Sequence, residues 1–189
     1  MKVQLIIGST RPSRMGKQFA DWVIDNLPKN NIEYELIDLL DFNLPLLDEP
    51  IMASQNKYQN KHTKVWSEKI KQADGYIWLT PEYNAGYSAA LKNAIDYLYH
   101  EWTNKPIMII SYGAGGGSSA SAQLRQVAER LKMQVVKEAP AIKLPYDSID
   151  ESGKIVNIDE ALKSYLPDLQ TASNELNSLL NKDSLVVTE

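Results

Sequence analysis

The chain has 189 residues, no cysteine and a formal charge of −4 at pH 7; 43% of its residues are hydrophobic and 23% are charged. These values exclude a disordered chain and a disulfide-stabilised fold, and the acidic balance argues against nucleic-acid binding, which would need a basic surface. No apolar run approaches the roughly 20 residues of a membrane span. We therefore expect one domain over residues 1–189, without membrane attachment, in the cytoplasm.

Short apolar runs alternate with segments of helical periodicity along most of the chain. The runs expected to form buried strands are Val3–Ile7, Tyr34–Leu39, Gly75–Thr80, Pro106–Ser111 and part of Gln134–Leu144. The expected helices are one with Phe19, Val23 and Leu27 on its inner face, then Val65–Ala73, Ser88–Tyr99 and Ser118–Lys132. This alternation predicts an α/β fold with helices on both faces of an open parallel sheet.

Two segments depart from the alternation. Phe42–Lys61 is a long connection rich in Pro, Asn and Gln, and connections of this length in compact domains are often functional. The C-terminal segment, about 159–183, has leucines at helical spacing, but Pro167 interrupts it. We expect two helices or one kinked helix there, followed by a frayed end at Ser184–Glu189.

The loop after the first strand carries groups that suit a phosphate. Gly8–Lys17 reads GSTRPSRMGK, with hydroxyls, two arginines and the free amides of a helix N-terminus. It is no P-loop, because seven residues separate its glycines and Gln18 follows the lysine. It is no dinucleotide fingerprint either, because Thr10 stands where a glycine is needed. The alternative is a helix cap within a polar surface loop.

Two further strand exits have unusual composition. Pro81–Tyr87 (PEYNAGY) follows the third strand and offers an aromatic ring, an amide side chain and turn amides that can face a planar ligand. Ser111–Ser119 follows the fourth strand, and its four glycines let the backbone approach a ligand closely. A capped turn and a flexible linker are the alternatives. Ligands of open α/β sheets lie at the carboxyl ends of strands, so the three loops together favour a flavin nucleotide.

At these residues the chain resembles the NAD(P)H-dependent FMN reductase family of flavodoxin-like proteins, which includes quinone, azo-dye and chromate reductases. The matching segments are Gly8–Gly16 (GSTRPSRMG), Leu44–Pro50 (LPLLDEP), Thr80–Leu98 (TPEYNAGYSAALKNAIDYL) and Ser111–Gln126 (SYGAGGGSSASAQLRQ). The resemblance covers roughly residues 2–145. It implies a doubly wound sheet of five parallel strands in the order 2-1-3-4-5, in three layers α/β/α, with FMN as cofactor.

The resemblance also implies which residues contact the FMN. The phosphate is expected at Ser9, Arg11, Arg14, Met15 and Gly16, the isoalloxazine ring at Pro81, Glu82, Tyr83, Asn84 and Ala85, and its pyrimidine side at Ser111, Gly113 and Gly116. No catalytic side chain is expected, because the flavin supplies the chemistry. His62 and His100 are interpreted as structural or exposed, and no metal site is expected.

The implied activity is a ping-pong oxidoreduction. Hydride passes from NADPH or NADH to FMN, the nicotinamide leaves, and a small acceptor such as a quinone, an azo compound or free flavin takes the electrons. The resemblance also implies a homodimer or homotetramer, and Tyr97, Tyr99, His100 and Trp102 form an aromatic cluster that is either interface or core edge. The competing hypotheses are a non-catalytic electron carrier of flavodoxin type and a nucleotide-binding regulatory module.

Overall fold

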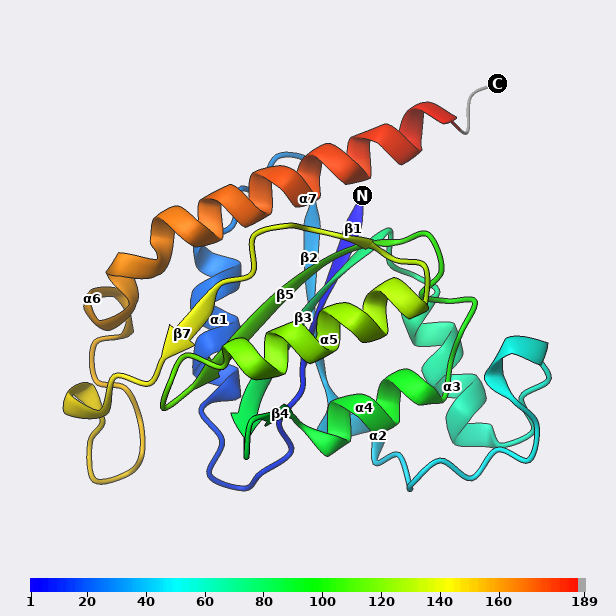
Figure 1. Cartoon of the computed structure of the whole chain (residues 1–189), viewed down its shortest axis with the longest axis horizontal. Coiled ribbons are helices and arrows are strands. Elements are labelled where there is room, and N and C mark those ends of the chain that lie inside the picture. The colour runs from blue at the N-terminus through cyan, green and yellow to red at the C-terminus, as the bar shows by residue number, and fades with distance from the viewer. Residues whose placement is uncertain (187–189) are drawn as a thin grey trace.

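Buried apolar strands form the centre of the computed structural model, which describes residues 1–186 and the side chains of 1–182 (Figure 1). The strands are β1 (Lys2–Ile7), β2 (Glu33–Asp38), β3 (Gly75–Tyr83), β4 (Gly86–Tyr87), β5 (Pro106–Gly113), β6 (Gln134–Val135) and β7 (Ala141–Lys143). The main path of the sheet is β2-β1-β3-β5-β6, and all its pairs are parallel. Counting these parallel strands in chain order confirms the predicted order 2-1-3-4-5.

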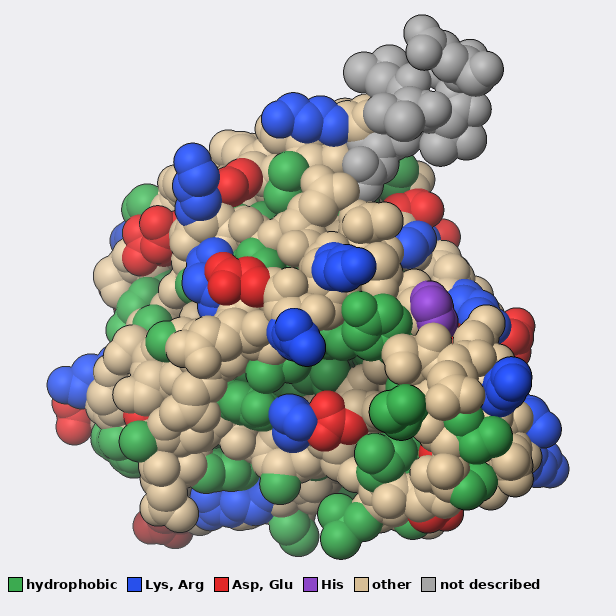
Figure 2. Space-filling view, turned by 45° about the vertical axis from the view of Figure 1, so that its right-hand side comes forward, with side chains coloured by type: hydrophobic (Ala, Val, Ile, Leu, Met, Phe, Trp, Pro, Cys, Tyr) green, Lys and Arg blue, Asp and Glu red, His purple; other side chains and the backbone are tan. Residues whose placement is uncertain are grey.

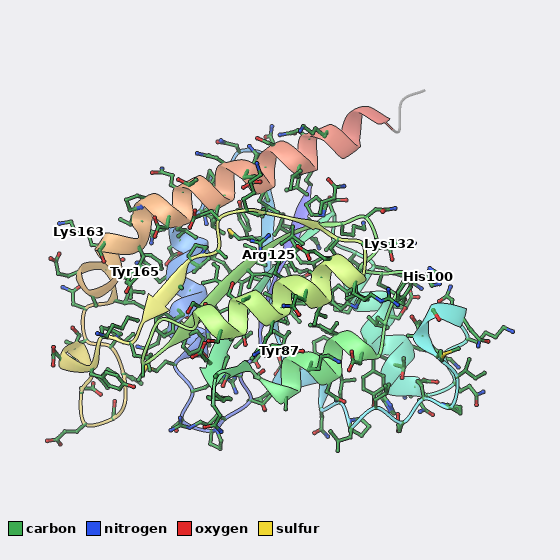
Figure 3. The ribbon with its side chains drawn as sticks, in the orientation of Figure 1. Tyr87, His100, Arg125, Lys132, Lys163 and Tyr165 are labelled. Carbon is green, nitrogen blue, oxygen red and sulfur yellow. The ribbon has the colours of Figure 1, made fainter. Side chains whose placement is uncertain are left out.

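The expected fifth strand is divided into β6 and β7, and together with the additional strand β4 this gives the sheet seven strands rather than five. β6 pairs with the first residues of β5 and β7 with its last residues. Between them the chain leaves the sheet, and Arg125 donates 2.8 Å hydrogen bonds to the carbonyls of Val136 and Lys137 (Figure 3). The seventh strand, β4, is antiparallel to the end of β3.

Helices cover both faces of the sheet, which confirms the predicted three layers. They are α1 (Gly16–Asn26), α2 (Leu39–Phe42), α3 (Lys61–Ile70), α4 (Ala89–Asp96), α5 (Ser118–Arg130), α6 (Ile158–Leu162) and α7 (Leu166–Val186). Side chains alternate along each strand, so Leu5 packs into the core beneath α1, α6 and α7, whereas Ile6 packs into the core beneath α3, α4 and α5. In the part of the chain that the structure describes, no helix is both long and apolar enough to span a bilayer.

Several element ends differ from the prediction. α3 begins four residues earlier than expected, at Lys61, and ends at Ile70; α4 ends at Asp96 rather than near Tyr99. The connection before α3 also contains the short α2 and a 3₁₀ turn at Ala53–Gln55. The first turn of α3 is polar (Lys61–Lys64), and the two turns before it are only four and three residues long, so apolar periodicity could not reveal them.

The C-terminal segment forms two helices, which is one of the two alternatives expected from the sequence. A 3₁₀ turn at Lys163–Tyr165 separates α6 from α7, and Pro167 lies in the first turn of α7, where its missing N–H costs little. The Tyr165 hydroxyl accepts a 3.0 Å hydrogen bond from the Lys143 amide, which fixes the turn beside β7 (Figure 3). α7 extends to Val186, so part of the stretch expected to fray is helical; residues 187–189 lie outside the described residues.

Candidate functional site

A cavity of about 400 Å³ lies at the carboxyl ends of β1, β3, β5 and β7. Because parallel strands end at one edge of the sheet, the loops that follow them converge there. The lining residues are Ser9, Arg11, Ser13, Arg14, Met15, Pro81, Glu82, Tyr83, Tyr112, Gly113, Ala114, Leu144 and Tyr146. The three loops singled out in the sequence therefore contribute to one cavity.

The first wall of this cavity is the loop between β1 and α1. No side chain caps the N-terminus of α1, and the first turn contains no acidic residue, so its positive end stays available to an anion. Gly16 begins this helix against the sheet: a Cβ atom there would lie 2.9 Å from the Ile7 side chain and 3.0 Å from the Tyr112 hydroxyl. Gly16 thus lets the helix start close to the sheet, and only its backbone can serve a ligand.

The two arginines of this loop differ in their surroundings. Arg11 is exposed, and its side chain makes no hydrogen bond or ion pair with any described residue. Arg14 is largely buried and donates to the carboxylate of Asp38 at the end of β2. The Arg14 Nε group is also buried and has no hydrogen-bond acceptor within the described chain. A buried donor without an acceptor is costly, so this group indicates a position for an anionic ligand atom.

The second wall is a hairpin rather than the loop that was predicted. β3 continues through Pro81, Glu82 and Tyr83, and the turn to β4 consists of Asn84 and Ala85, with φ angles of 50° and 63°. Two successive residues of positive φ define the tight turn that matches the twist of a hairpin. The prediction ended the strand at Thr80 because proline usually interrupts strands.

Two hydrogen bonds tie this hairpin to α5. The Glu82 carboxylate accepts a 3.1 Å hydrogen bond from the Ala120 amide in the first turn of α5, and Gln123 donates a 2.8 Å hydrogen bond to the Ala85 carbonyl. The Tyr83 hydroxyl lies 2.9 Å from the Ser9 hydroxyl, so the tyrosine bridges the first and second walls. The Tyr83 ring remains 40% exposed at the mouth of the cavity.

We predict that Ala85→Gly stabilises the protein by about 0.5–1 kcal/mol, because a left-handed conformation costs alanine about 1–2 kcal/mol and costs glycine almost nothing. The greater conformational entropy that glycine gives the unfolded chain offsets only part of this gain. Denaturant unfolding of the apoprotein measures the change. Ala89→Gly, at an exposed position in the first turn of α4, is the control and should destabilise by up to about 1 kcal/mol. Equal losses in both variants would contradict the assigned turn.

The third wall is the glycine-rich loop after β5. Ser111 is buried and donates a 3.2 Å hydrogen bond to the Gly116 carbonyl, so its hydroxyl supports the loop from inside rather than lining the cavity. Gly116 and Gly117 have φ angles of 93° and 87°. Gly113 lies against Glu82, where a Cβ atom would come within 3.2 Å of the glutamate side chain. The loop is thereby packed closely against the hairpin.

Tyr112 was not among the predicted contacts, yet it lies at the floor of the cavity. Its ring stacks on Phe19 with the centroids 4.6 Å apart. Burial is the main cause that raises the pKa of the Tyr112 hydroxyl well above its usual range, so the group stays protonated and can donate a hydrogen bond at neutral pH. Its place within the predicted loop Ser111–Ser119 was the available signal in the sequence.

A second hollow of about 710 Å³ adjoins the first, and Arg11, Glu82 and Tyr83 line both. Asn84 lines this second hollow together with residues at the start of α4. Four predicted contacts, Gly16, Ala85, Ser111 and Gly116, line neither one. They shape the three walls through their backbones or through internal hydrogen bonds.

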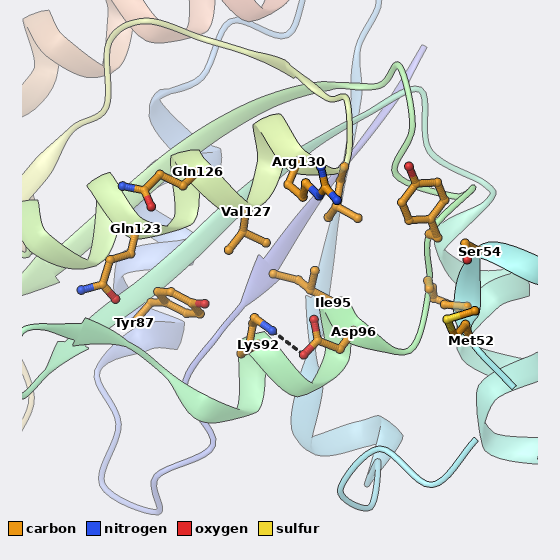
Figure 4. Close-up of a pocket in the computed structure, with 14 residues that line it drawn as sticks. Met52, Ser54, Tyr87, Lys92, Ile95, Asp96, Gln123, Gln126, Val127 and Arg130 are labelled. Carbon is orange, nitrogen blue, oxygen red and sulfur yellow. Dashed lines mark hydrogen bonds and ion pairs between the residues drawn. The ribbon is translucent and has the colours of Figure 1, made fainter. Parts of the chain in front are cut away.

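A groove of about 620 Å³ lies apart from these cavities, between α4 and α5 (Figure 4). Its floor includes Ile95, Leu98, Val127 and Leu131, and a Lys92–Asp96 ion pair lies along one side. Figure 2 shows apolar side chains gathered in a hollow on the face turned forward. Of the aromatic cluster noted in the sequence, Tyr97 and Trp102 are fully buried, so only Tyr99 and His100 reach the surface.

The long connection before α3 is fixed by polar contacts at Asp48. One carboxylate oxygen lies 2.9 Å from His62 Nε2, 3.0 Å from the Tyr97 hydroxyl and 2.9 Å from the Asn60 amide nitrogen. Burial alone would raise the pKa of this carboxyl, but the hydrogen bonds from these three side chains outweigh it and lower the pKa below its ordinary value. His62 therefore makes a structural contact with Asp48, which is one of the two alternatives expected of it.

We predict that these contacts are lost at acidic pH. The folded-state pKa of Asp48 lies below the ordinary value of 3.8, so the carboxylate stabilises the fold above that pH and loses its contribution as the pH falls through the folded-state value. Asp48→Asn should therefore destabilise the protein at pH 6 and progressively less below pH 4. Urea unfolding across this range is the measurement. A stability difference that does not change with pH would contradict the assignment.

Comparison with known proteins identifies the family of the chain. The model of the family described as NADPH-dependent FMN reductase matches residues 1–144, which is more than half of the chain. The chain belongs to the NADPH-dependent FMN reductase family. An NAD(P)H-dependent FMN reductase of Schizosaccharomyces pombe is 40% identical over 185 residues, covering 96% of this chain and 92% of that protein. An NADPH:quinone oxidoreductase of Arabidopsis thaliana is 30% identical over 181 residues, covering 90% of each.

A solved structure shares the fold. FerB from Paracoccus denitrificans, titled a flavoenzyme NAD(P)H:(acceptor) oxidoreductase, superposes with a TM-score of 0.70 at 21% identity, covering 94% of this chain and 97% of that one. The flavodoxin-like fold expected from the sequence is thus confirmed. As a member of the NADPH-dependent FMN reductase family, the protein is an oxidoreductase that uses FMN and a reduced nicotinamide.

The residues present fit the FMN of an NADPH-dependent FMN reductase. An uncapped helix N-terminus, an unpaired arginine and a buried guanidinium donor without an acceptor match the charge of a terminal phosphate. The cavity then extends from this loop to the exposed ring of Tyr83. Leu144 and Tyr146 also line it, although no motif in the sequence indicated them.

Proposed function

We propose that this protein is an NAD(P)H:quinone oxidoreductase that works as a cytoplasmic homodimer. Bound FMN would supply the redox chemistry that links a reduced nicotinamide to the acceptor. The observation that carries the proposal is the pair of adjoining hollows, which share Arg11, Glu82 and Tyr83. One hollow has the cationic loop that a phosphate requires, and the other leaves room for a second planar molecule beside it.

The residues of the chain then have distinct tasks. Arg11 supplies the positive charge that balances the phosphate, Arg14 donates hydrogen bonds to it, and the hydroxyl of Ser9 holds Tyr83 at the mouth. The backbone amides of the glycine-rich loop can face negative charge on the flavin ring, a form of preorganised electrostatic stabilisation. Glu82 is held by the Ala120 amide, so its carboxylate supports the hairpin instead of acting as a base.

A quinone is the acceptor favoured by similarity. A relative that matches 90% of this chain is named an NADPH:quinone oxidoreductase, and further relatives in Pseudomonas putida are named quinone reductases. Azo compounds and free flavin remain the alternatives within the same reaction scheme. An electron carrier of flavodoxin type is the alternative with a different reaction scheme. Such a carrier would not accept hydride from a nicotinamide.

Anaerobic absorbance spectroscopy of the holoenzyme tests the function. Addition of NADPH or NADH should bleach the flavin absorbance, and menadione should restore it with steady turnover. An azo dye and free FMN, supplied at the same concentration, rank the other acceptors. A protein that is yellow but is not bleached by either nicotinamide would establish the carrier, and turnover with the azo dye alone would overturn the quinone assignment.

The groove between α4 and α5 supports the homodimer. It has an apolar floor, and the nearby connection exposes Leu46 and Met52 by 85% and 69%. Exposed apolar side chains beside an apolar groove are typical of a surface that a partner covers. Sedimentation velocity should show a dimer that Val127→Glu, within the groove, converts to monomer. Val156→Glu, at an exposed site outside the groove, is the control; a wild-type monomer would refute the dimer.

The cytoplasm is proposed on two grounds. The chain has no cysteine and so needs no oxidising compartment, and reduced nicotinamides are available there. Cell fractionation with detection of the native protein checks this; recovery in a membrane or secreted fraction would contradict it.

A further inference from the structure

Asp38 lies at the junction between the phosphate loop and the long connection. It is the last residue of β2 and pairs with Ile7, the last residue of β1, so its side chain emerges beside the loop that follows β1. One carboxylate oxygen accepts a hydrogen bond from the Arg14 guanidinium. The other accepts a 3.1 Å hydrogen bond from the Leu40 amide and caps α2.

These two contacts fix the carboxylate, and the carboxylate in turn fixes the guanidinium. The side chains of Arg14 and Asp38 are only 14% and 17% exposed, so neither is free to rotate in solvent. A long arginine side chain normally loses conformational freedom when it binds a ligand, and this loss weakens binding. An arginine that is already held loses less.

The donors of Arg14 that the ion pair leaves unused indicate the kind of ligand that this side chain binds. The ion pair uses a terminal nitrogen, whereas the Nε group is buried with no acceptor among the described residues, and Arg14 lines the cavity. If Arg14 served only the ion pair, its buried Nε donor would cost desolvation free energy that no hydrogen bond offsets. A phosphate oxygen would satisfy it.

We propose that Asp38 is a positioning residue for the cofactor phosphate and acts through Arg14. The inference rests on the proposed phosphate site. The Asp38 charge also repels a phosphate, but the arginine that it orients lies between them, and the unpaired Arg11 supplies the excess positive charge of the loop. The benefit of an oriented donor therefore exceeds the repulsion.

Flavin titrations of the apoprotein test this role, with flavin fluorescence as the readout. Asp38→Asn keeps the shape and the helix cap, since asparagine caps helices as well as aspartate does, but removes the charge that holds Arg14. We expect the dissociation constant for FMN to rise about 10-fold and that for riboflavin, which lacks the phosphate, to stay unchanged. Asp41→Asn, the same change at an exposed position three residues on, should alter neither constant.

A double-mutant cycle separates positioning from a general structural effect. In an Arg14→Ala background, Asp38→Asn should have no further effect on FMN binding, because its partner is already absent. Equal or tighter FMN binding by Asp38→Asn, a parallel loss for riboflavin, or additive losses in the double variant would each overturn the inference. If the wild-type protein bound FMN and riboflavin equally, the proposed phosphate site itself would fail, which is a different result.

Discussion

Arg11→Ala is expected to raise the dissociation constant for FMN by about 10- to 100-fold while leaving riboflavin binding nearly unchanged. Hydrogen bonds to charged groups contribute about 1.5–3 kcal/mol, and Arg11 is the cation of the loop without an ion-pair partner in the described structure. Its full charge is therefore available to a phosphate. Titration of apoprotein with each flavin, followed by fluorescence, measures the effect.

Lys17→Ala is the matched control for this loss of charge. Lys17 lies in the first turn of α1, close in sequence to Arg11, but its ammonium group pairs with Asp21 at 2.9 Å and is well exposed. Its removal should change FMN binding by less than about 3-fold, as expected for a screened surface charge. Similar losses in both variants would mean that only the general field of the loop attracts FMN, and Arg11 would have no specific contact.

Gly117→Ala is expected to destabilise the protein by about 2–4 kcal/mol, which corresponds to a fall in melting temperature of roughly 5–15 °C. Gly117 has a φ of 87°, and a Cβ atom there would lie 2.9 Å from the Ser111 Cβ and 3.1 Å from the Tyr112 amide nitrogen. Alanine would thus meet both backbone strain and a contact with rigid neighbours. The loop would have to shift, so FMN binding should weaken as well.

Gly115→Ala, two residues earlier in the same loop, separates this mechanism from a general intolerance of side chains. A Cβ atom at Gly115 would meet no atom within 4 Å, and its φ is not in the left-handed region. We expect a change in stability within about 0.5 kcal/mol, measured by thermal and denaturant unfolding. Comparable destabilisation in the two variants would show that the loop conformation described for Ser111–Gly117 is wrong.

The sequence indicated the fold and the location of the site because both depend on local patterns. Apolar runs bounded by turn residues mark strands, and parallel strands bring their carboxyl ends to one edge. Ser9, Arg11 and Tyr83 follow such runs, so their convergence on one cavity could be expected. The role of each of these residues toward FMN stays a prediction.

Contacts between residues far apart in sequence could not be predicted in this way. The pairing of Arg14 with Asp38 depends on the register of β1 against β2, and Tyr146 reaches the cavity only because the chain returns to β5 through β7. The continuation of β3 past Pro81 was missed because its pairing with β5 and β4 involves partners that local propensity does not describe. Tertiary pairing decided each of these features.

The strand beside β5 is divided into β6 and β7, and this division disfavours self-association of the molecule through the edge of its sheet. A long, regular edge strand exposes a row of amides and carbonyls on which another chain can form a strand. Here β6 and β7 have two and three residues, and Pro140, which has no amide hydrogen, lies between them. At the opposite edge, β2 carries Glu33 and Glu35. Both margins of the sheet are thus poor templates for intermolecular strand addition and amyloid-like growth.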